Sequence, residues 1–158
     1  MSYEVGHSEY LISDDPGRLE IDAIHAFLSQ DSYWAAGISR ERLETAIANS
    51  LPFGLYIDGK QIGFARAVSD FSTFAYLADV YVDEAHRERG LAKLLLDAVI
   101  RHPRLRQLRR WMLGTRDAHG LYAQFGFVPL EDPGRWMELP DPTTYDETPE
   151  RQEVGRPS

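Results

Sequence analysis

A strand-to-helix junction carries the residues with the clearest capacity for chemistry. Residues 78–93 run ADVYVDEAHRERGLAK, a β-prone run that leads through a polar loop into a helix beginning near Gly90. The first turn of a helix offers free backbone N–H groups and the positive end of the helix dipole, which together bind anions. Gly90 and Ala92 carry little or no side chain, so a phosphate can approach that backbone. The spacing therefore predicts a phosphate site, with Arg87 and Arg89 adding positive charge.

This junction matches neither of the two common phosphate loops. It lacks the Gly-Lys-Ser/Thr ending of the P-loop and the three glycines of the dinucleotide fingerprint, which disfavours nucleotide hydrolysis and nicotinamide chemistry. The chain contains no cysteine, which excludes a cysteine nucleophile and a thiolate metal site. The histidines at positions 7, 25 and 102 show no metal-ligand spacing, so we expect no metal.

Alternating helix and strand signals surround the junction and predict an α/β fold. Apolar residues at helical spacing predict helices at 19–28, 90–102 and 117–125. A further helix is predicted to begin after an N-cap at Ser39 and to end before Pro52. Runs of β-prone residues predict strands at 53–57, 60–68, 74–82 and 110–113, and two final strands at 127–128 and 136–139. Asp58-Gly59 is typical of the tight turn in a β-hairpin.

Taken in this order, the elements and motifs resemble the GNAT superfamily of acyl-CoA-dependent N-acyltransferases. The Arg/Gln-x-x-Gly-x-Gly/Ala signature of that family matches Arg87 to Ala92, and its Leu-Tyr-x-x-x-Gly-Phe element matches Leu121 to Phe127. The resemblance covers roughly residues 19–139. It implies a mixed, mostly antiparallel central sheet flanked by about four helices, with a splayed strand pair forming an acetyl-CoA cleft. We expect one N-acetyltransferase domain at 1–139 and a loose polar tail at 140–158.

The resemblance also implies which residues bind acetyl-CoA. The pantetheine arm would pair like an extra strand with the backbone of Val80, Tyr81 and Val82. The pyrophosphate would lie on the backbone amides of six consecutive residues, Arg87, Glu88, Arg89, Gly90, Leu91 and Ala92.

Tyr122 lies where the family often places the general acid that reprotonates the leaving CoA thiolate. A thiol has a pKa of about 8.5 and a phenol one of about 10, so a tyrosine keeps its proton until the thiolate needs it. The alternative is that the Tyr122 ring only packs against the helix and sheet.

Asp79 is the second candidate catalytic residue. Beside the acetyl site, its carboxylate could hold the incoming ammonium and receive its proton through water. The alternative places Asp79 on an exposed strand face or at a β-bulge. Without a cysteine nucleophile, the expected route is direct attack of a primary amine within a ternary complex.

Charge is distributed unevenly along the chain. Residues 84–116 hold nine Lys or Arg against three acids, although the whole chain has a net charge of −8. The acidic remainder favours a cationic amine as acceptor, and the aromatic residues that could line its pocket are Tyr33, Trp34, Phe71, Phe74 and Tyr76. The arginines of 101–111 raise nucleic-acid binding as a rival function, but the acidic pI of about 5.1 argues against it.

The partners and compartment follow from weaker signals. The N-terminus has neither a basic start nor an apolar stretch, and no run approaches the roughly 20 apolar residues that cross a bilayer. We therefore expect a cytoplasmic protein with no membrane or nucleic-acid partner. A homodimer that exchanges a hydrophobic C-terminal strand is a further expectation. The alternative function is a non-catalytic acyl-CoA-binding sensor or interaction module.

Overall fold

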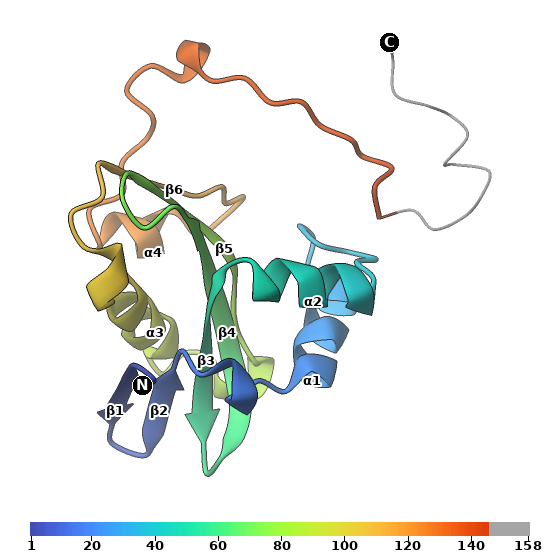
Figure 1. Cartoon of the computed structure of the whole chain (residues 1–158), viewed down its shortest axis with the longest axis vertical. Helices are drawn as coiled ribbons and strands as arrows, with labels where there is room; N and C mark the ends of the chain where they lie inside the picture. The colour runs from blue at the N-terminus through green and yellow to red at the C-terminus, as the bar shows by residue number, and fades with distance from the viewer. Residues whose placement is uncertain (146–158) are drawn as a thin grey trace.

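The computed structural model describes residues 1–145, which form one six-stranded sheet flanked by helices (Figure 1). The strands follow chain order across the sheet, and only the last pair is parallel. They are β1 (Glu4–His7), β2 (Tyr10–Ser13), β3 (Leu51–Ile57), β4 (Lys60–Ser69), β5 (Phe74–Val82) and β6 (Arg110–Met112). The helices are α1 (Ile21–Ala26), α2 (Arg40–Ala48), α3 (Leu91–Ile100) and α4 (His119–Ala123). The predicted mixed, mostly antiparallel architecture is thereby confirmed.

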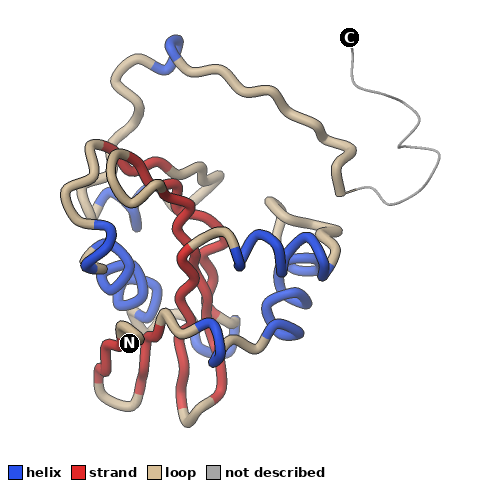
Figure 2. The backbone as a smooth tube through the Cα atoms, viewed as in Figure 1, coloured by secondary structure: helices blue, strands red, loops and turns tan. Residues whose placement is uncertain are grey.

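Helices lie on both faces of this sheet (Figure 2), and an apolar core lies on each face. On one face α3 buries Leu95 and Leu96 against the sheet. On the other face α1 and α2 bury Ile24 and Leu43 against Phe64 of β4. The helix spacing seen in the sequence therefore matches the faces that the helices bury. The predicted cap is also present, because Ser39 Oγ accepts the backbone N–H of Arg42 at 3.1 Å.

A β-bulge divides β5 into two halves, and the side chains of the two halves alternate between the faces of the sheet in opposite order. Between the pairs Arg66↔Ala78 and Phe64↔Tyr81, β4 advances two residues and β5 advances three. Asp79 lies in this step with φ at 56°. One extra residue reverses which side chains face which layer. Leu77 accordingly packs in the α3 core, whereas Tyr81 packs against α1 and α2.

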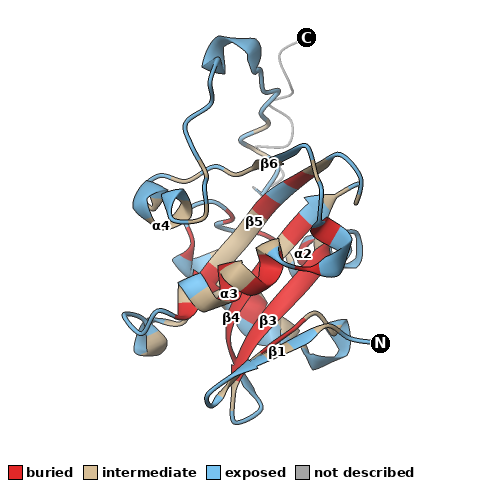
Figure 3. Cartoon of the chain, turned by 90° about the vertical axis from the view of Figure 1, so that its left-hand side faces the viewer, coloured by how far each residue is buried: buried red, intermediate tan, exposed pale blue. Residues whose placement is uncertain are grey.

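Three local predictions differ from the structure. The hairpin of β1 and β2 was not predicted, although its turn lies at Ser8, where φ is 54°. The strands expected at 127–128 and 136–139 are wrong, because residues 126–132 and 136–140 are neither helix nor strand. Pro129, Pro133 and Pro140 lack the N–H that a ladder needs. The chain after α4 projects away from the sheet instead (Figure 3).

The last helix is shorter than predicted. It begins at His119 instead of Asp117, and the Thr115 hydroxyl accepts the backbone N–H of Ala118 at 3.1 Å. The helix ends at Ala123, and the turn that follows it ends at Gly126, whose φ is 94°. Of the predicted polar tail, residues 140–145 are described and 146–158 lie outside the described residues. No helix within 1–145 is long and apolar enough to cross a membrane.

A buried His102–Asp14 pair ties the N-terminal hairpin to the segment after α3. His102 Nε2 lies 2.8 Å from Asp14 Oδ2, and His102 Nδ1 accepts the backbone N–H of Arg104 at 3.1 Å. Replacing His102 with alanine should lower the free energy of unfolding by about 3 kcal/mol, because a partly buried carboxylate loses its partner. Urea unfolding measures this loss, with the exposed His7→Ala as control. Equal stability of the two variants would contradict the proposed tie.

Candidate active site

The loop from β5 into α3 forms a cradle of free backbone amides. Within residues 1–145, the N–H groups of residues 88–93 donate to no protein acceptor. Glu88 and Gly90 both have positive φ, 65° and 73°, which turns successive amides toward one side. A Cβ built on Gly90 would meet no heavy atom within 4 Å, so the space beside it is open. The backbone N–H of Arg87, which the sequence analysis also placed in the cradle, donates instead to the Glu84 carbonyl at 3.3 Å. Free amides at a helix start are a common anion site, and the binding of a diphosphate here stays a prediction.

β5 extends beyond the short strand β6, and this leaves an open strand edge that leads to the cradle. The two strands pair only where Phe74–Tyr76 faces Arg110–Met112. Beyond Tyr76, β5 continues to Val82, paired with β4 on one side and, within residues 1–145, with no strand on the other. Val80, Tyr81 and Val82 lie on this open stretch, and their pairing with a pantetheine arm stays a prediction. At the end of this stretch, Arg87 Nε–H donates a hydrogen bond to the Val82 carbonyl at 2.9 Å.

Tyr122 lies on α4, beside β6. It is half-buried and lines a cavity of about 360 Å³ together with residues of β6 and of 127–130. Its ring meets the Phe127 ring edge-on, with centroids 6.0 Å apart. Burial raises the pKa of the Tyr122 phenol, and Tyr33 raises it further. The phenol therefore stays protonated at neutral pH, and it lies close enough to Tyr33 to interact electrostatically with it.

Asp79 lies at the β-bulge of β5, a position that the sequence analysis gave as one alternative for it. Its carboxylate is nearly buried, and each oxygen accepts a hydrogen bond from a different element. Trp34 Nε1–H donates to Oδ1 at 2.9 Å, and Arg66 Nε–H donates to Oδ2 at 2.5 Å. Arg66 was missed in the sequence, although a lone arginine between Ala65 and Ala67 of a central strand signals a buried carboxylate partner.

An aromatic cluster from the chain between α1 and α2 covers the same region. The Tyr33 and Trp34 rings meet edge-on with centroids 5.1 Å apart, and Phe27 stacks on Tyr81 at 3.9 Å. The Tyr33 hydroxyl accepts the backbone N–H of Arg116 at 2.9 Å, and the Arg116 guanidinium lies 3.9 Å from the ring centroid. Tyr33 thus joins the α1–α2 connection to the segment that precedes α4.

Other residues considered in the sequence do not join this cluster. Phe71 lies beneath the Arg104 guanidinium at 3.8 Å and packs on the α3 core. Tyr76 is 41% exposed at the point where β5 and β6 part, and its hydroxyl faces Gly114. Within the described chain, no three His, Cys, Asp or Glu side chains gather in a way that could hold a metal ion.

Comparisons with known proteins agree with this geometry. The sequence model of the Acetyltransferase (GNAT) family matches residues 20–127, and the chain belongs to this family. A Gibberella zeae protein described as a "putative acetyltransferase" is 35% identical over 139 residues, which cover 73% of this chain and 77% of that protein.

Solved structures share the fold. A protein of Xanthomonas campestris pv. campestris, assigned to the GNAT family, is 48% identical with a TM-score of 0.85 and covers 89% of this chain and 99% of its own. A Clostridium acetobutylicum protein whose structure was determined with acetyl-CoA is 16% identical with a TM-score of 0.60, covering 83% of this chain and 94% of its own. This second likeness concerns the fold alone.

Proposed function

We propose that this protein transfers an acetyl group from acetyl-CoA to a primary amine by direct attack in a ternary complex. One observation carries the proposal: the open edge of β5 leads directly into six consecutive free backbone amides. An extended polar chain that ends in a diphosphate would satisfy both features at once. The reacting end of that chain would then lie at the bulge, beside Asp79.

Binding would use the backbone more than side chains. The amide-bearing pantetheine arm extends the sheet along Val80 to Val82, and the diphosphate accepts hydrogen bonds from the amides of residues 88–92. Arg89 is exposed and adds charge at the cradle, whereas Arg87 fixes the end of β5. This arrangement aligns the thioester with the bulge instead of leaving it to diffuse.

Tyr122 supplies the proton that the leaving thiolate requires. The neutral amine attacks the thioester carbon, the C–N bond forms, and the C–S bond breaks as the thiolate takes the phenolic proton. Burial keeps the phenol neutral before this step. Solvent then returns a proton to the phenolate, so the enzyme is unchanged after each turnover.

Asp79 attracts and orients the incoming amine. Both of its oxygens already accept one hydrogen bond, and each retains a lone pair that can accept another. Because Arg66 offsets the charge of Asp79, the pair as a whole is neutral. Hydrogen bonds of defined geometry therefore hold the amine more than net electrostatic attraction does. Water carries away the proton that the ammonium must lose before attack.

Substitutions in the Arg66–Asp79 pair distinguish a role of Asp79 in positioning the amine from a role as general base. If the two residues act as one positioning unit, Asp79→Asn and Arg66→Gln should each lower kcat/KM for the amine by about 10- to 100-fold. The double variant should then lose little more than either single variant. A loss for Asp79→Asn that far exceeds the loss for Arg66→Gln would instead assign proton abstraction to Asp79.

Direct attack also predicts the state of the protein before the amine arrives. Incubation with acetyl-CoA alone should leave the intact mass of the protein unchanged, because no acetyl-enzyme forms on this route. The measurement is mass spectrometry within one turnover time, followed by addition of amine. An acetylated protein that passes its acetyl group to the added amine would contradict direct attack.

A further inference from the structure

We infer that the acetyl acceptor is an amine that also carries a carboxylate, and that the Arg116 guanidinium binds this carboxylate. The inference rests on the proposed acetyl transfer and adds the chemical class of the acceptor. Arg116 is exposed in the segment between β6 and α4. Within residues 1–145 it forms no ion pair, although Asp117 is its neighbour in the chain. Its planar set of N–H donors matches the two oxygens of a carboxylate.

Tyr33 holds both the backbone and the side chain of Arg116. The Tyr33 hydroxyl accepts the backbone N–H of Arg116 at 2.9 Å, and the guanidinium lies 3.9 Å from the centroid of the Tyr33 ring. A guanidinium that lies over a ring still has N–H groups at its edge with which to bind a ligand. Arg116 is therefore ordered before a ligand arrives, which lowers the entropy cost of binding.

Tyr33 also places Arg116 near the side chains proposed to act on the amine and the thiolate. The Tyr33 ring meets the Trp34 ring edge-on, and Trp34 Nε1–H donates to Asp79 at 2.9 Å. Tyr33 is likewise close enough to Tyr122 to interact electrostatically with its phenol. Tyr33 and Trp34 are 46% and 40% exposed, so their rings form an open surface between Asp79 and Arg116. An amine held by Asp79 can therefore extend over these rings and present a carboxylate to Arg116.

The local charge favours such an acceptor over a polycation. Arg66 offsets the charge of Asp79, whereas no ion pair within residues 1–145 offsets the charge of Arg116. Among the described residues that line the cavity of about 360 Å³ beside Tyr122, none is Asp or Glu. A polyamine would meet one neutralised carboxylate, and the Arg116 guanidinium would repel its second ammonium. The site therefore differs in charge from the whole chain, whose net charge of −8 favours a cationic acceptor.

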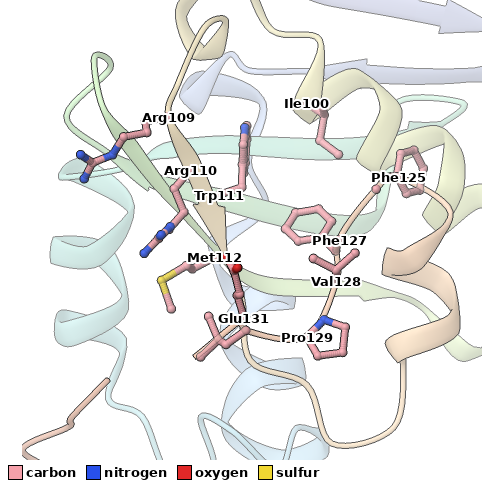
Figure 4. Close-up of a pocket in the computed structure, with 12 residues that line it drawn as sticks. Ile100, Arg109, Arg110, Trp111, Met112, Phe125, Phe127, Val128, Pro129 and Glu131 are labelled. Atoms are coloured by element: carbon pink, nitrogen blue, oxygen red, sulfur yellow. The ribbon is translucent and has the colours of Figure 1, made fainter. Parts of the chain in front are cut away.

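A second arginine adds positive charge to the same face of the sheet. Figure 4 shows the Arg110 and Met112 side chains on the side of β6 away from Phe127. Trp111, which lies between them in the sequence, packs against the α3 core, and successive residues of a strand face opposite sides. Arg110 therefore lies on the face that α1 and α2 cover, and it too forms no ion pair within the described chain. This charge would attract the carboxylate as the acceptor approaches.

Thiol release with matched acceptors tests the inference. Each member of a series of amino acids, from glycine through ω-amino acids of increasing length, is compared with the alkylamine that lacks only the carboxylate. Rates are referred to the concentration of neutral amine, so that differences in amine pKa do not bias the comparison. The best amino acid should exceed its alkylamine by about 10- to 100-fold in kcat/KM, the effect of one charged hydrogen-bonded pair. Equal values for the paired acceptors, or a preference for polyamines, would overturn the inference.

Substitution of Arg116 identifies the group that binds the carboxylate. Arg116→Gln should lower kcat/KM for the best amino acid by about 10- to 100-fold and leave the value for its alkylamine within about twofold of wild type. The retained alkylamine activity shows that the variant is folded. Arg101→Gln alters an exposed arginine that pairs with Asp97 on α3, and this matched control should change neither value.

The outcomes separate this inference from the proposed function. An equal loss for both acceptors in Arg116→Gln, with amine-dependent thiol release by the wild type, would overturn the carboxylate site and leave the acetyl transfer standing. Absence of thiol release with every amine tested would contradict the acetyl transfer, and this inference with it.

Discussion

Replacing Tyr122 with phenylalanine should lower kcat by about 100- to 10,000-fold while the affinity for acetyl-CoA stays unchanged. The substitution removes one oxygen from a half-buried ring and leaves its edge-on contact with Phe127 in place. Only the proton donor is lost, so the effect falls on the step in which the thiolate leaves. Steady-state kinetics measures kcat, and calorimetric titration measures the affinity for acetyl-CoA.

Two controls make the Tyr122 result specific. Tyr10→Phe alters a half-buried phenol on β2, outside the site, and should leave kcat unchanged. Tyr33→Phe tests the phenol that interacts with Tyr122, and a larger loss there than for Tyr122→Phe would assign the acid to Tyr33. Because burial raises the pKa of Tyr122, the phenol is protonated throughout the neutral range. The wild-type rate should therefore show no loss from Tyr122 ionisation across the neutral pH range.

Replacing Gly90 with glutamate should weaken acetyl-CoA binding by at least about 100-fold. The new carboxylate enters the open space beside the cradle, where it repels a diphosphate and competes for the same amides. The residue also sits at φ 73°, which strains any side chain there. Calorimetric titration with acetyl-CoA measures the loss.

A matched substitution separates these effects. Gly59 also has a positive φ, 78°, and also has no heavy atom within 4 Å of a built Cβ, but it lies in the β3–β4 turn. Gly59→Glu should lose stability from backbone strain and keep its affinity for acetyl-CoA. Equal loss of affinity in both variants would mean that strain, not the cradle, explains the result, and retained binding by Gly90→Glu would contradict the placement of the diphosphate.

The parts of the fold that could be predicted are those with strong local signals. The hairpin of β3 and β4 follows from Asp58-Gly59, and both residues adopt the positive φ that such a turn requires. The bounds of β5 match the prediction at both ends, because Val82 is followed at once by the polar loop. The sequence predicted a phosphate cradle at residues 87–92 from small residues at a helix start together with a family resemblance, whereas the backbone N–H of Arg87 donates to the Glu84 carbonyl and the free amides begin at Glu88.

The remaining features depend on contacts between distant parts of the chain. Asp79 was expected near the acetyl site, but its partners Trp34 and Arg66 lie 45 and 13 residues away along the sequence. No local pattern specifies such a pairing. The hairpin of β1 and β2 is a local pairing, and it was missed because its turn at Ser8 and Glu9 contains none of the glycine, asparagine or aspartate residues that mark such turns. The prediction of strands after α4 was wrong because apolar residues alone do not form a strand. A neighbouring strand must also be available for pairing.

Release of CoA thiol from acetyl-CoA in the presence of a panel of amines tests the central claim most directly. The panel includes polyamines, amino sugars, amino acids and peptide N-termini, and the chain adds no thiol background because it has no cysteine. Our account predicts amine-dependent thiol release by the wild type, strongly reduced in Tyr122→Phe. Measured binding of acetyl-CoA without release in the presence of any amine, peptides included, would contradict it and favour a non-catalytic acyl-CoA sensor.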